Sequence, residues 1–108
     1  MSQTKIQMVV TDLDGTLLSE KNEICPEAAA VIAGLEERGV RFTFITGRPP
    51  YGVRRFMQNL TITAPIVACN GAIIAASETL QILDCQELPL APLAALLQAA
   101  DGQGMTVL

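Results

Sequence analysis

The sequence predicts an α/β domain with a parallel sheet, on the basis of three segments near its amino end. Residues 8–11 and 40–45 are apolar runs of strand length. Between them, apolar residues recur at helical spacing after Pro26, and proline suits the first turn of a helix. A strand, a crossover helix and a second strand form a right-handed unit with parallel strands. The carboxyl ends of both strands then meet at one edge of the sheet.

The crossover helix is expected to cover one face of this sheet. Gly39 suits the position just beyond its carboxyl end, where the backbone turns away. The apolar stripe that should face the strands consists of Ala28, Val31, Ile32 and Leu35.

A second helix and a third strand are expected after residue 45. The helix should begin near Pro50, and the strand at 66–69 should be followed by an apolar return at 72–76. Asn70-Gly71 between these two runs is typical of a two-residue hairpin turn. The apolar stripe of the helix near Pro50 consists of Val53, Phe56, Met57 and Leu60.

The composition shifts toward alanine and leucine near the end of the chain. A strand is expected at residues 80–87, then a helix that ends near Gly102, then a strand that begins at Met105. We place a boundary between two parts of the chain near Cys85. The stripe of the late helix consists of Leu90, Leu93, Ala94, Leu97 and Ala100.

Composition narrows the classes of function. The chain has 108 residues, 50% of them hydrophobic, which suits one small domain. A net charge of -4, with no basic cluster larger than Arg54-Arg55, argues against a nucleic acid partner. The sequence has no histidine, so any acid-base catalysis must be carried out by carboxylates. No stretch has the length of a membrane span, so we expect no membrane partner. The three cysteines form no Cys-x-x-Cys motif, which favours a reducing cytoplasm.

Two carboxylates, Asp12 and Asp14, follow the first strand directly. Alternate residues of an extended backbone project to one side, so both acids can face one pocket while Leu13 points into the packing. Neighbouring carboxylates repel, and such a pair indicates either a shared proton or a bound divalent cation. Gly15 and Thr16 provide main-chain N–H groups and a hydroxyl that suit the oxygens of a bound anion.

Asp-Leu-Asp-Gly-Thr at residues 12–16, after an apolar strand, resembles the first signature of the haloacid dehalogenase (HAD) superfamily of phosphotransferases. The resemblance implies that Asp12 attacks phosphorus to form an aspartyl-phosphate, and that Asp14 protonates the leaving oxygen and later activates water. It also implies Mg²⁺ bound by the Asp12 carboxylate and the Asp14 main-chain carbonyl. The implied fold is a three-layer, Rossmann-like HAD core with a parallel sheet.

The second strand runs into Thr46, Gly47 and Arg48, and parallel sheets place ligand chemistry at the carboxyl ends of strands. Phe-Ile-Thr-Gly-Arg at residues 44–48 is similar to the second HAD signature, which implies that the Thr46 hydroxyl binds the transferring phosphoryl group. Gly47 lets the backbone approach a ligand, and a helix near Pro50 would aim N–H groups at it. Arg48 has two open interpretations: it holds a substrate phosphate or carboxylate, or it pairs structurally with an acid.

Asn70 also has two interpretations. Hairpin geometry alone explains it, but Cys-Asn-Gly-Ala-Ile at residues 69–73 resembles an element of the Cof-like, sugar-phosphatase-like branch of the superfamily. That resemblance makes Asn70 a candidate substrate contact. In this branch an α/β cap is inserted after the third core strand. The resemblance therefore implies that residues 1–85 are the N-terminal part of a HAD core and residues 86–108 the start of a cap.

The sequence lacks part of the family pattern. The family requires a lysine that steadies the phosphoryl charge, but Lys5 and Lys21 are the only lysines and neither lies where that signature belongs. It also requires later acids that complete the Mg²⁺ site, and Asp84 and Asp101 lack the Gly-Asp context of that signature. We therefore expect the N-terminal portion of a longer phosphatase, with little or no turnover by these 108 residues alone.

Two classes of function remain. The first is a Mg²⁺-dependent phosphomonoester hydrolase that acts on small phosphorylated metabolites such as sugar phosphates. The second is a non-catalytic binding or assembly module that retains the fold and a weak anion or metal site. In the usual strand order of the family the first strand is central, with the second and third strands on one side and the missing later strands on the other. Unless the missing half is supplied separately, residues 8–11 would therefore form an apolar sheet edge without a neighbour. Such an edge invites pairing with another chain, so we expect self-association.

Overall fold

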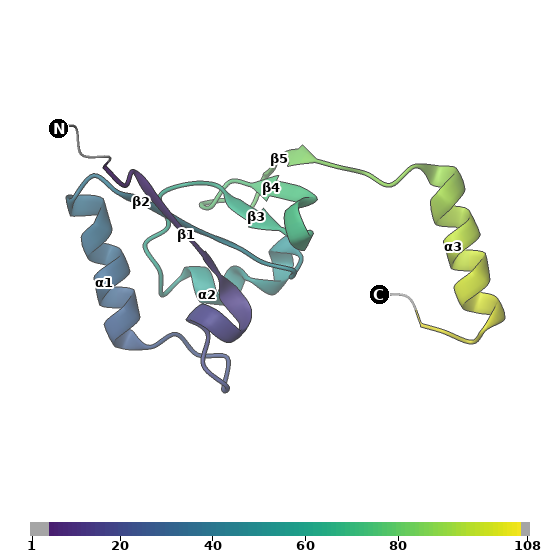
Figure 1. Cartoon of the computed structure of the whole chain (residues 1–108), viewed down its shortest axis with the longest axis horizontal. Coiled ribbons are helices and arrows are strands. Elements are labelled where there is room, and N and C mark those ends of the chain that lie inside the picture. The colour runs from purple at the N-terminus through teal and green to yellow at the C-terminus, as the bar shows by residue number, and fades with distance from the viewer. Residues whose placement is uncertain (1–4, 107–108) are drawn as a thin grey trace.

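A computed structural model describes residues 5–106 and shows a five-stranded sheet flanked by helices (Figure 1). The strands lie in the order β1-β2-β3-β4-β5. β1, β2 and β3 are parallel, and β4 and β5 continue the sheet in antiparallel pairs. The predicted α/β class with a parallel core is confirmed. The strands are β1 (Met8–Asp12), β2 (Arg41–Ile45), β3 (Ile66–Ala68), β4 (Ile73–Ala75) and β5 (Ile82–Cys85).

Helix α1 (Pro26–Glu37) connects β1 to β2 and begins at the predicted proline. Gly39, with φ of +74°, takes the left-handed conformation that turns the chain toward β2. Ile32 is buried and Leu35 packs against the core. Val31 was predicted in the same stripe, but it is 69% exposed. The helix contacts mainly β2, so one narrow row of its side chains fills the contact and Val31 lies beside that row.

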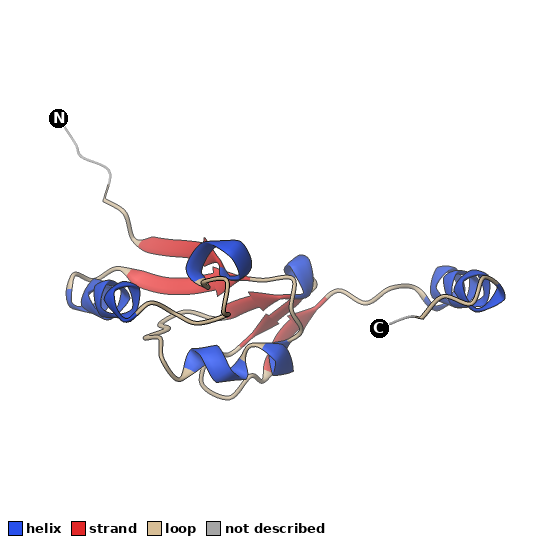
Figure 2. Cartoon of the chain, turned by 90° about the horizontal axis from the view of Figure 1, so that it is seen from below, coloured by secondary structure: helices blue, strands red, loops and turns tan. Residues whose placement is uncertain are grey.

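The hydrophobic core lies on one face of the sheet. Side chains alternate along each strand, and the inward set includes Phe44 of β2 and Ile66 of β3, both 0% exposed. Helices α1 and α2 (Arg54–Met57) add Ile32 and Phe56 to the same cluster. Figure 2 shows the sheet from its side, with α2 beneath the strands. Both helices therefore cover the same face.

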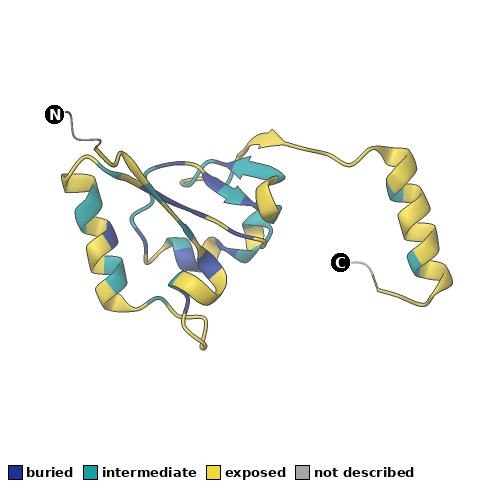
Figure 3. Cartoon of the chain, viewed as in Figure 1, coloured by how far each residue is buried: buried dark blue, intermediate teal, exposed yellow. Residues whose placement is uncertain are grey.

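The opposite face of β1 and β2, which we call the open face, is not covered by α1, α2 or α3 in the described part of the chain. Strand alternation places Met8, Val10 and Ile45 on it, and these side chains are 43%, 45% and 44% exposed. Figure 3 shows exposed residues along β1. Parallel sheets usually have both faces covered, so this exposure is unusual for the fold class.

The helix predicted to begin near Pro50 consists of two short pieces. A 3₁₀ turn, η2 (Pro50–Gly52), precedes the four-residue α2, and Gly52 at the end of η2 disfavours a continuous helix. The predicted apolar face is still buried at Val53, Phe56 and Leu60. A helical turn therefore begins at Pro50 as predicted, and a contact between its N–H groups and a ligand stays a prediction.

Four residues, 69–72, join β3 to β4, so the predicted two-residue hairpin turn is wrong. The N–H groups of Cys69 and Asn70 donate to the carbonyl oxygens of Arg48 and Thr46, each at 3.0 Å. These bonds tie the connection, which contains the 3₁₀ turn η3, to the loop after β2. In a two-residue turn the N–H groups of Cys69 and Asn70 would not reach the loop after β2. The need to bond to that loop explains the longer connection.

The carboxyl-terminal part follows the prediction less closely. β5 is shorter than the strand expected at 80–87, because it pairs only with the three residues of β4. Helix α3 (Leu90–Gly102) lies at the predicted place, but it stands away from the sheet and none of its residues is buried (Figures 1 and 2). Residues 105–106 form no strand, and residues 107–108 lie outside the described part. No helix within residues 5–106 combines the length and apolarity needed to cross a membrane.

Candidate functional site

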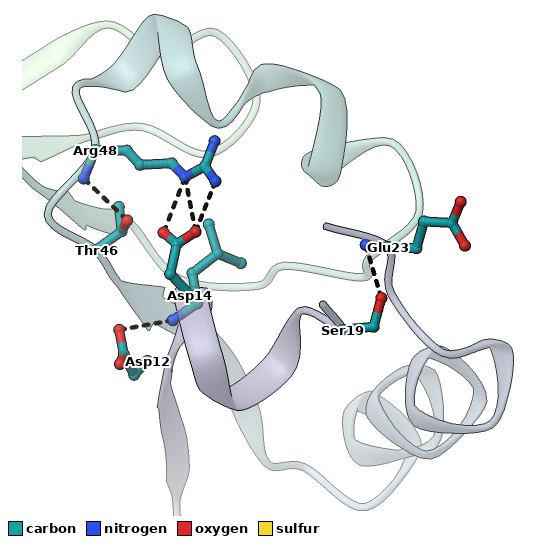
Figure 4. Close-up of polar contacts among 7 residues, drawn as sticks. Asp12, Asp14, Ser19, Glu23, Thr46 and Arg48 are labelled. Carbon is teal, nitrogen blue, oxygen red and sulfur yellow. Dashed lines mark hydrogen bonds and ion pairs between the residues drawn. The ribbon is translucent and has the colours of Figure 1, made fainter. Parts of the chain in front are cut away.

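The carboxyl ends of β1 and β2 bring the two predicted signatures to one edge of the sheet. Asp12 is the register partner of Ile45, so it lies beside the residue that precedes Thr46. The turn η1 (Leu13–Leu17) leaves β1 at this point and meets the loop that follows β2 (Figure 4). Contacts between the two loops join residues 34 positions apart in the sequence.

Asp12 ends β1 with an exposed side chain. Its Oδ1 accepts a hydrogen bond from the main-chain N–H of Leu13 at 2.8 Å. Leu13 is 0% exposed, so the backbone that carries Asp12 is anchored in the core. Asp14 is exposed again. The predicted arrangement of one buried leucine between two accessible acids is therefore confirmed.

Arg48 forms a bidentate ion pair with Asp14 (Figure 4). Its Nε donates to the Asp14 oxygens Oδ2 and Oδ1 at 2.9 and 3.2 Å, and its Nη2 donates to Oδ1 at 2.6 Å. The guanidinium carbon also lies 5.1 Å from the centre of the Phe56 ring. Of the two interpretations left open for Arg48, the structure shows the pairing with an acid, and that acid belongs to the first signature.

This ion pair changes the proton affinity of both groups. The hydrogen bond from Arg48 is the main cause that lowers the pKa of Asp14, and the same bond raises the pKa of Arg48. The Asp14 side chain is 47% exposed, so solvent weakens the interaction. In this arrangement Asp14 is ionised at neutral pH. To donate a proton, Asp14 must first part from Arg48.

Thr46 is buried at the end of β2, with 2% of its surface exposed. Its Oγ1 accepts a hydrogen bond from the main-chain N–H of Arg48 at 3.0 Å. This bond leaves the hydroxyl hydrogen of Thr46 available, because a hydroxyl donates one hydrogen bond and accepts others. The position suits the phosphoryl contact predicted for Thr46, and that contact stays a prediction.

Gly47 and Asn70 lie against each other at the same edge. A Cβ atom at Gly47 would stand 3.0 Å from Oδ1 of Asn70, which is closer than carbon atoms normally approach such an oxygen. A larger residue at position 47 would therefore require the Asn70 side chain to shift by a few tenths of an ångström. The sequence does not predict this contact, because no local signal joins residues so far apart. Contact between Asn70 and a substrate remains a prediction.

Gly15 and Thr16 lie in η1 beside Asp14. Gly15 has φ of +76°, a conformation that favours glycine, and it lets η1 turn back after β1. The turn closes where the N–H of Leu18 donates to the carbonyl oxygen of Leu13 at 2.9 Å. Both Gly15 and Thr16 are exposed. The anion contacts predicted for them stay predictions.

The oxygen donors at this edge fit Mg²⁺. The Asp12 carboxylate and the Asp14 main-chain carbonyl are hard oxygen ligands, and Mg²⁺ usually binds one or two carboxylates together with water and phosphate oxygens. Within residues 5–106, no group of three or more His, Cys, Asp and Glu side chains is placed to hold a metal ion. A cation at this edge therefore needs water and substrate oxygens for its remaining ligands.

Comparison with known proteins agrees with the two signatures. Residues 9–108 match the haloacid dehalogenase-like hydrolase family. The chain belongs to this family. The HAD resemblance found in the two loop signatures is therefore confirmed, and the Rossmann-like HAD fold with it.

The curated relatives of this HAD chain include phosphatases. The pyridoxal phosphate phosphatase YbhA of Escherichia coli (strain K12) is 29% identical over 84 residues, which are 78% of this chain and 31% of the relative. The 5-amino-6-(5-phospho-D-ribitylamino)uracil phosphatase YitU of Bacillus subtilis (strain 168) is 35% identical over 72 residues, which are 67% of this chain and 27% of the relative. The chain thus spans less than a third of the length of these relatives.

Solved structures show the same fold. A haloacid dehalogenase-like hydrolase from Bacteroides thetaiotaomicron superposes with a TM-score of 0.78 at 29% identity, covering 91% of this chain and 38% of that chain. A haloacid dehalogenase-like hydrolase from B. subtilis gives a TM-score of 0.80 at 22% identity, covering 92% of this chain and 34% of that chain. At the lower identity the likeness concerns the fold alone.

Proposed function

We propose that this HAD chain carries the nucleophile and the acid-base residue of a Mg²⁺-dependent phosphomonoester hydrolase. The observation that supports this most is the register of β1 and β2, which sets Asp12 beside the loop of Thr46. The ion pair between Asp14 and Arg48 holds the two loops together at that edge. The phosphatase names of the relatives point to the same chemistry.

The proposed reaction has two steps. A carboxylate oxygen of Asp12 attacks phosphorus, the bond from phosphorus to the ester oxygen breaks, and Asp14 gives its proton to that oxygen. Asp14 then takes a proton from water, which attacks the phosphorus of the aspartyl-phosphate and releases Asp12. The Thr46 hydroxyl and the N–H groups near Gly15 hold the phosphoryl oxygens. Bound Mg²⁺ neutralises negative charge on the phosphoryl group.

Arg48 is proposed to change partners during this cycle. Its guanidinium fork, which now holds the Asp14 carboxylate at two points, matches the geometry of a phosphate equally well. A phosphate that reaches the site competes with Asp14 for Arg48. Asp14 is then released from Arg48 and faces the negative charge of the phosphate, which raises the pKa of its carboxyl and favours the protonated form that the leaving oxygen needs.

The proposed substrates are small phosphorylated metabolites, sugar phosphates among them. The names of two relatives specify phosphate esters of small molecules, a pyridoxal phosphate and a phosphoribitylamino compound. These substrates share the phosphate and differ in the rest of the molecule. The phosphate contacts at Thr46, Gly47 and Arg48 are accordingly the part of recognition that we assign to this chain, with Asn70 as a contact to the remainder.

Turnover by the 108 residues alone is proposed to be little or none. The charge-stabilising lysine and the later metal-binding acids of the family pattern are not among these residues. Losing such electrostatic groups typically removes several kcal/mol of transition-state stabilisation. The test of function therefore needs a readout of the nucleophile itself beside an assay of hydrolysis.

Fluoroberyllate, a mimic of a phosphoryl group on a carboxylate, provides that readout. We expect a bound ¹⁹F NMR signal in the presence of Mg²⁺, lost in Asp12→Asn and kept in Asp84→Asn, a matched exposed acid on β5. Hydrolysis of an aryl phosphate with Mg²⁺ is measured in parallel. If the unaltered chain shows any hydrolysis, Asp12→Asn should lower its rate.

The alternative function is a non-catalytic binding or assembly module. The observation that favours it is the ion pair of the exposed Asp14 carboxylate with Arg48, because a paired carboxylate is not free for acid-base chemistry. Such a module would bind inorganic phosphate without using Asp12 and would give no fluoroberyllate signal. Two results together would overturn the phosphatase proposal: phosphate still binds to Asp12→Asn, and the unaltered chain gives no bound fluoroberyllate signal.

A further inference from the structure

Arg55 lies close to the site, although neither of the two signatures contains it. It belongs to α2, and its guanidinium carbon stands 4.5 Å from the centre of the Phe56 ring. The guanidinium carbon of Arg48 stands 5.1 Å from the same centre. Guanidinium groups are attracted to aromatic rings at such distances. One ring, itself only 4% exposed, therefore holds both arginine side chains beside the site.

The two arginines share one acid. Arg48 binds the Asp14 carboxylate through two of its nitrogen atoms, whereas Arg55 acts on Asp14 through its charge alone. Two positive charges therefore lie beside this acid, in a chain whose net charge is -4. Because like charges repel, an anion that lies beside both Arg48 and Arg55 is stabilised by each of them.

The guanidinium of Arg55 is accessible and holds no acid. Arg55 is exposed, and within residues 5–106 it forms no ion pair. A cavity of about 320 Å³ lies next to it, between α2 and the loop at residues 22–24, and Glu23 lines the other side of this cavity. A guanidinium that is stacked on a ring and not bound to a carboxylate keeps its planar set of donors for another anion.

Arg54, the preceding residue of α2, shows what is particular to Arg55. Successive residues of a helix point about 100° apart, so the two side chains leave α2 in different directions. Arg54 is also exposed, but it lines other cavities, beside Leu80 and the connection between β4 and β5. In the described structure only Arg48 and Arg55 stack on the Phe56 ring. Arg54 thus carries the same charge on the same helix without this contact.

We propose that Arg55 is a second phosphate-binding arginine of this site and acts together with Arg48 from the Phe56 ring. The inference deepens the proposed function and rests on it for the choice of a phosphate monoester as the anion. When the phosphate takes Arg48 from Asp14, Arg55 donates to one of its terminal oxygens. Two guanidinium groups then balance the two negative charges of the phosphate.

The test is the affinity of the whole chain for inorganic phosphate, measured by NMR titration without Mg²⁺ at constant ionic strength. The side-chain Nε–H signals of Arg48 and Arg55 should shift together and give one dissociation constant. Arg55→Gln should raise this constant about tenfold, because it removes a charge-assisted hydrogen bond. Arg54→Gln is the matched control and should change it by less than about twofold. Arg55→Lys keeps the charge without the planar fork and should fall between them.

Three results would overturn the role of Arg55. The first is an equal loss of affinity in Arg55→Gln and Arg54→Gln, which would reveal a general effect of charge. The second is an unchanged dissociation constant in Arg55→Gln, as expected if Arg55 serves only to face Glu23 across the cavity. The third is an Arg55 signal that does not move with phosphate in the unaltered chain. This last measurement needs no variant, so the test stays decisive if Arg55→Gln does not fold.

The proposed function is measured separately, by the fluoroberyllate signal that depends on Asp12. A signal from the unaltered chain, together with an unchanged phosphate affinity in Arg55→Gln, would overturn the role of Arg55 and leave the phosphatase proposal intact. No such signal, together with a phosphate affinity that falls in Arg55→Gln, would overturn the phosphatase proposal and support Arg55 as part of an anion site.

Discussion

The ion pair between Asp14 and Arg48 is the strongest polar contact between the two signature loops. It uses the planar guanidinium fork, which a lysine cannot reproduce. Because the pair lies partly in solvent, its contribution to stability is small, about 0.2–1 kcal/mol. Its larger effect is on protonation, since it lowers the pKa of the Asp14 carboxyl.

Arg48→Gln is therefore expected to raise the pKa of Asp14 toward its usual range, because the main cause of the lowered pKa is removed. The pKa is measured by NMR titration of the Asp14 carboxyl carbon. Arg55→Gln is the matched control, since Arg55 lowers the same pKa more weakly, through charge alone. A larger rise in Arg55→Gln than in Arg48→Gln would contradict the structural explanation.

The same pair gives a pH dependence of stability with a definite sign. The folded state has the lowered pKa, so the pair stabilises it above the usual pKa of an aspartate and this contribution disappears as pH falls through the folded value. Arg48→Gln should thus reduce the free energy of unfolding by about 0.2–1 kcal/mol at neutral pH. Urea unfolding at several pH values should show that the difference in unfolding free energy between the unaltered chain and Arg48→Gln vanishes in acid. A difference that grows in acid would contradict this explanation.

Thr46 is expected to support both structure and anion binding. Thr46→Val removes the acceptor of the Arg48 N–H, and leaving that group unpaired costs about 1–3 kcal/mol of unfolding free energy. Thr46→Ser keeps the hydroxyl and should lose less. Urea unfolding measures the stability, and ¹⁹F NMR with fluoroberyllate measures the site. Equal behaviour of the two variants would show that the hydroxyl has no role.

At the scale of elements, β2 holds the site and the core together. Phe42 and Phe44 point into the cluster formed with α1 and α2, and Ile45 and Thr46 lead directly into the second signature. The packing of β2 in the core therefore fixes the position of the loop that follows it. Val31 on α1, in contrast, contributes almost nothing to the core because most of its side chain is in solvent.

Phe44→Ala is expected to cost about 3–5 kcal/mol of unfolding free energy, since it removes a ring with no exposed surface from a packed cluster. Val31→Ala should change the free energy by less than about 0.5 kcal/mol. Both are measured by urea unfolding monitored by circular dichroism. Similar losses in the two variants would mean that α1 packs through Val31 after all.

At the scale of the whole molecule, the chain has a sheet with one covered face and a helix that stands apart from it. Helix α3 follows residues 86–89, which make no strand, and it buries none of its residues. Short helices are marginal in water without tertiary contacts. The boundary that we place near Cys85 falls between the sheet and this helix, and the start of a cap there stays a prediction.

Removing residues 86–108 is accordingly expected to leave the urea midpoint of the sheet within experimental scatter of the whole chain, because no buried side chain is lost. Amide hydrogen exchange should show weaker protection in α3 than in β2. A clear fall in the midpoint after the removal would show that α3 stabilises the sheet and that the boundary is misplaced.

The sequence alone predicted β1, α1, β2, β3 and α3 and the identity of the two signatures. Apolar runs, the proline at the start of α1 and the spacing of Asp12 and Asp14 are local patterns, so they could be recognised without knowledge of distant contacts. Leu13 is buried between exposed acids as strand alternation predicted, but it lies in the turn η1 and not in β1, so the correct outcome has another structural basis. The meeting of the carboxyl ends of β1 and β2 followed from the crossover connection between two parallel strands.

Only the tertiary structure decided which groups meet. Arg48 pairs with Asp14, the connection after β3 bonds to the loop after β2, and Val31 faces solvent, because each outcome depends on which surfaces face one another in space. Local periodicity records that a side chain is apolar or charged, whereas its partner is set by packing between segments distant in sequence. The open face likewise emerges only when the sheet is assembled.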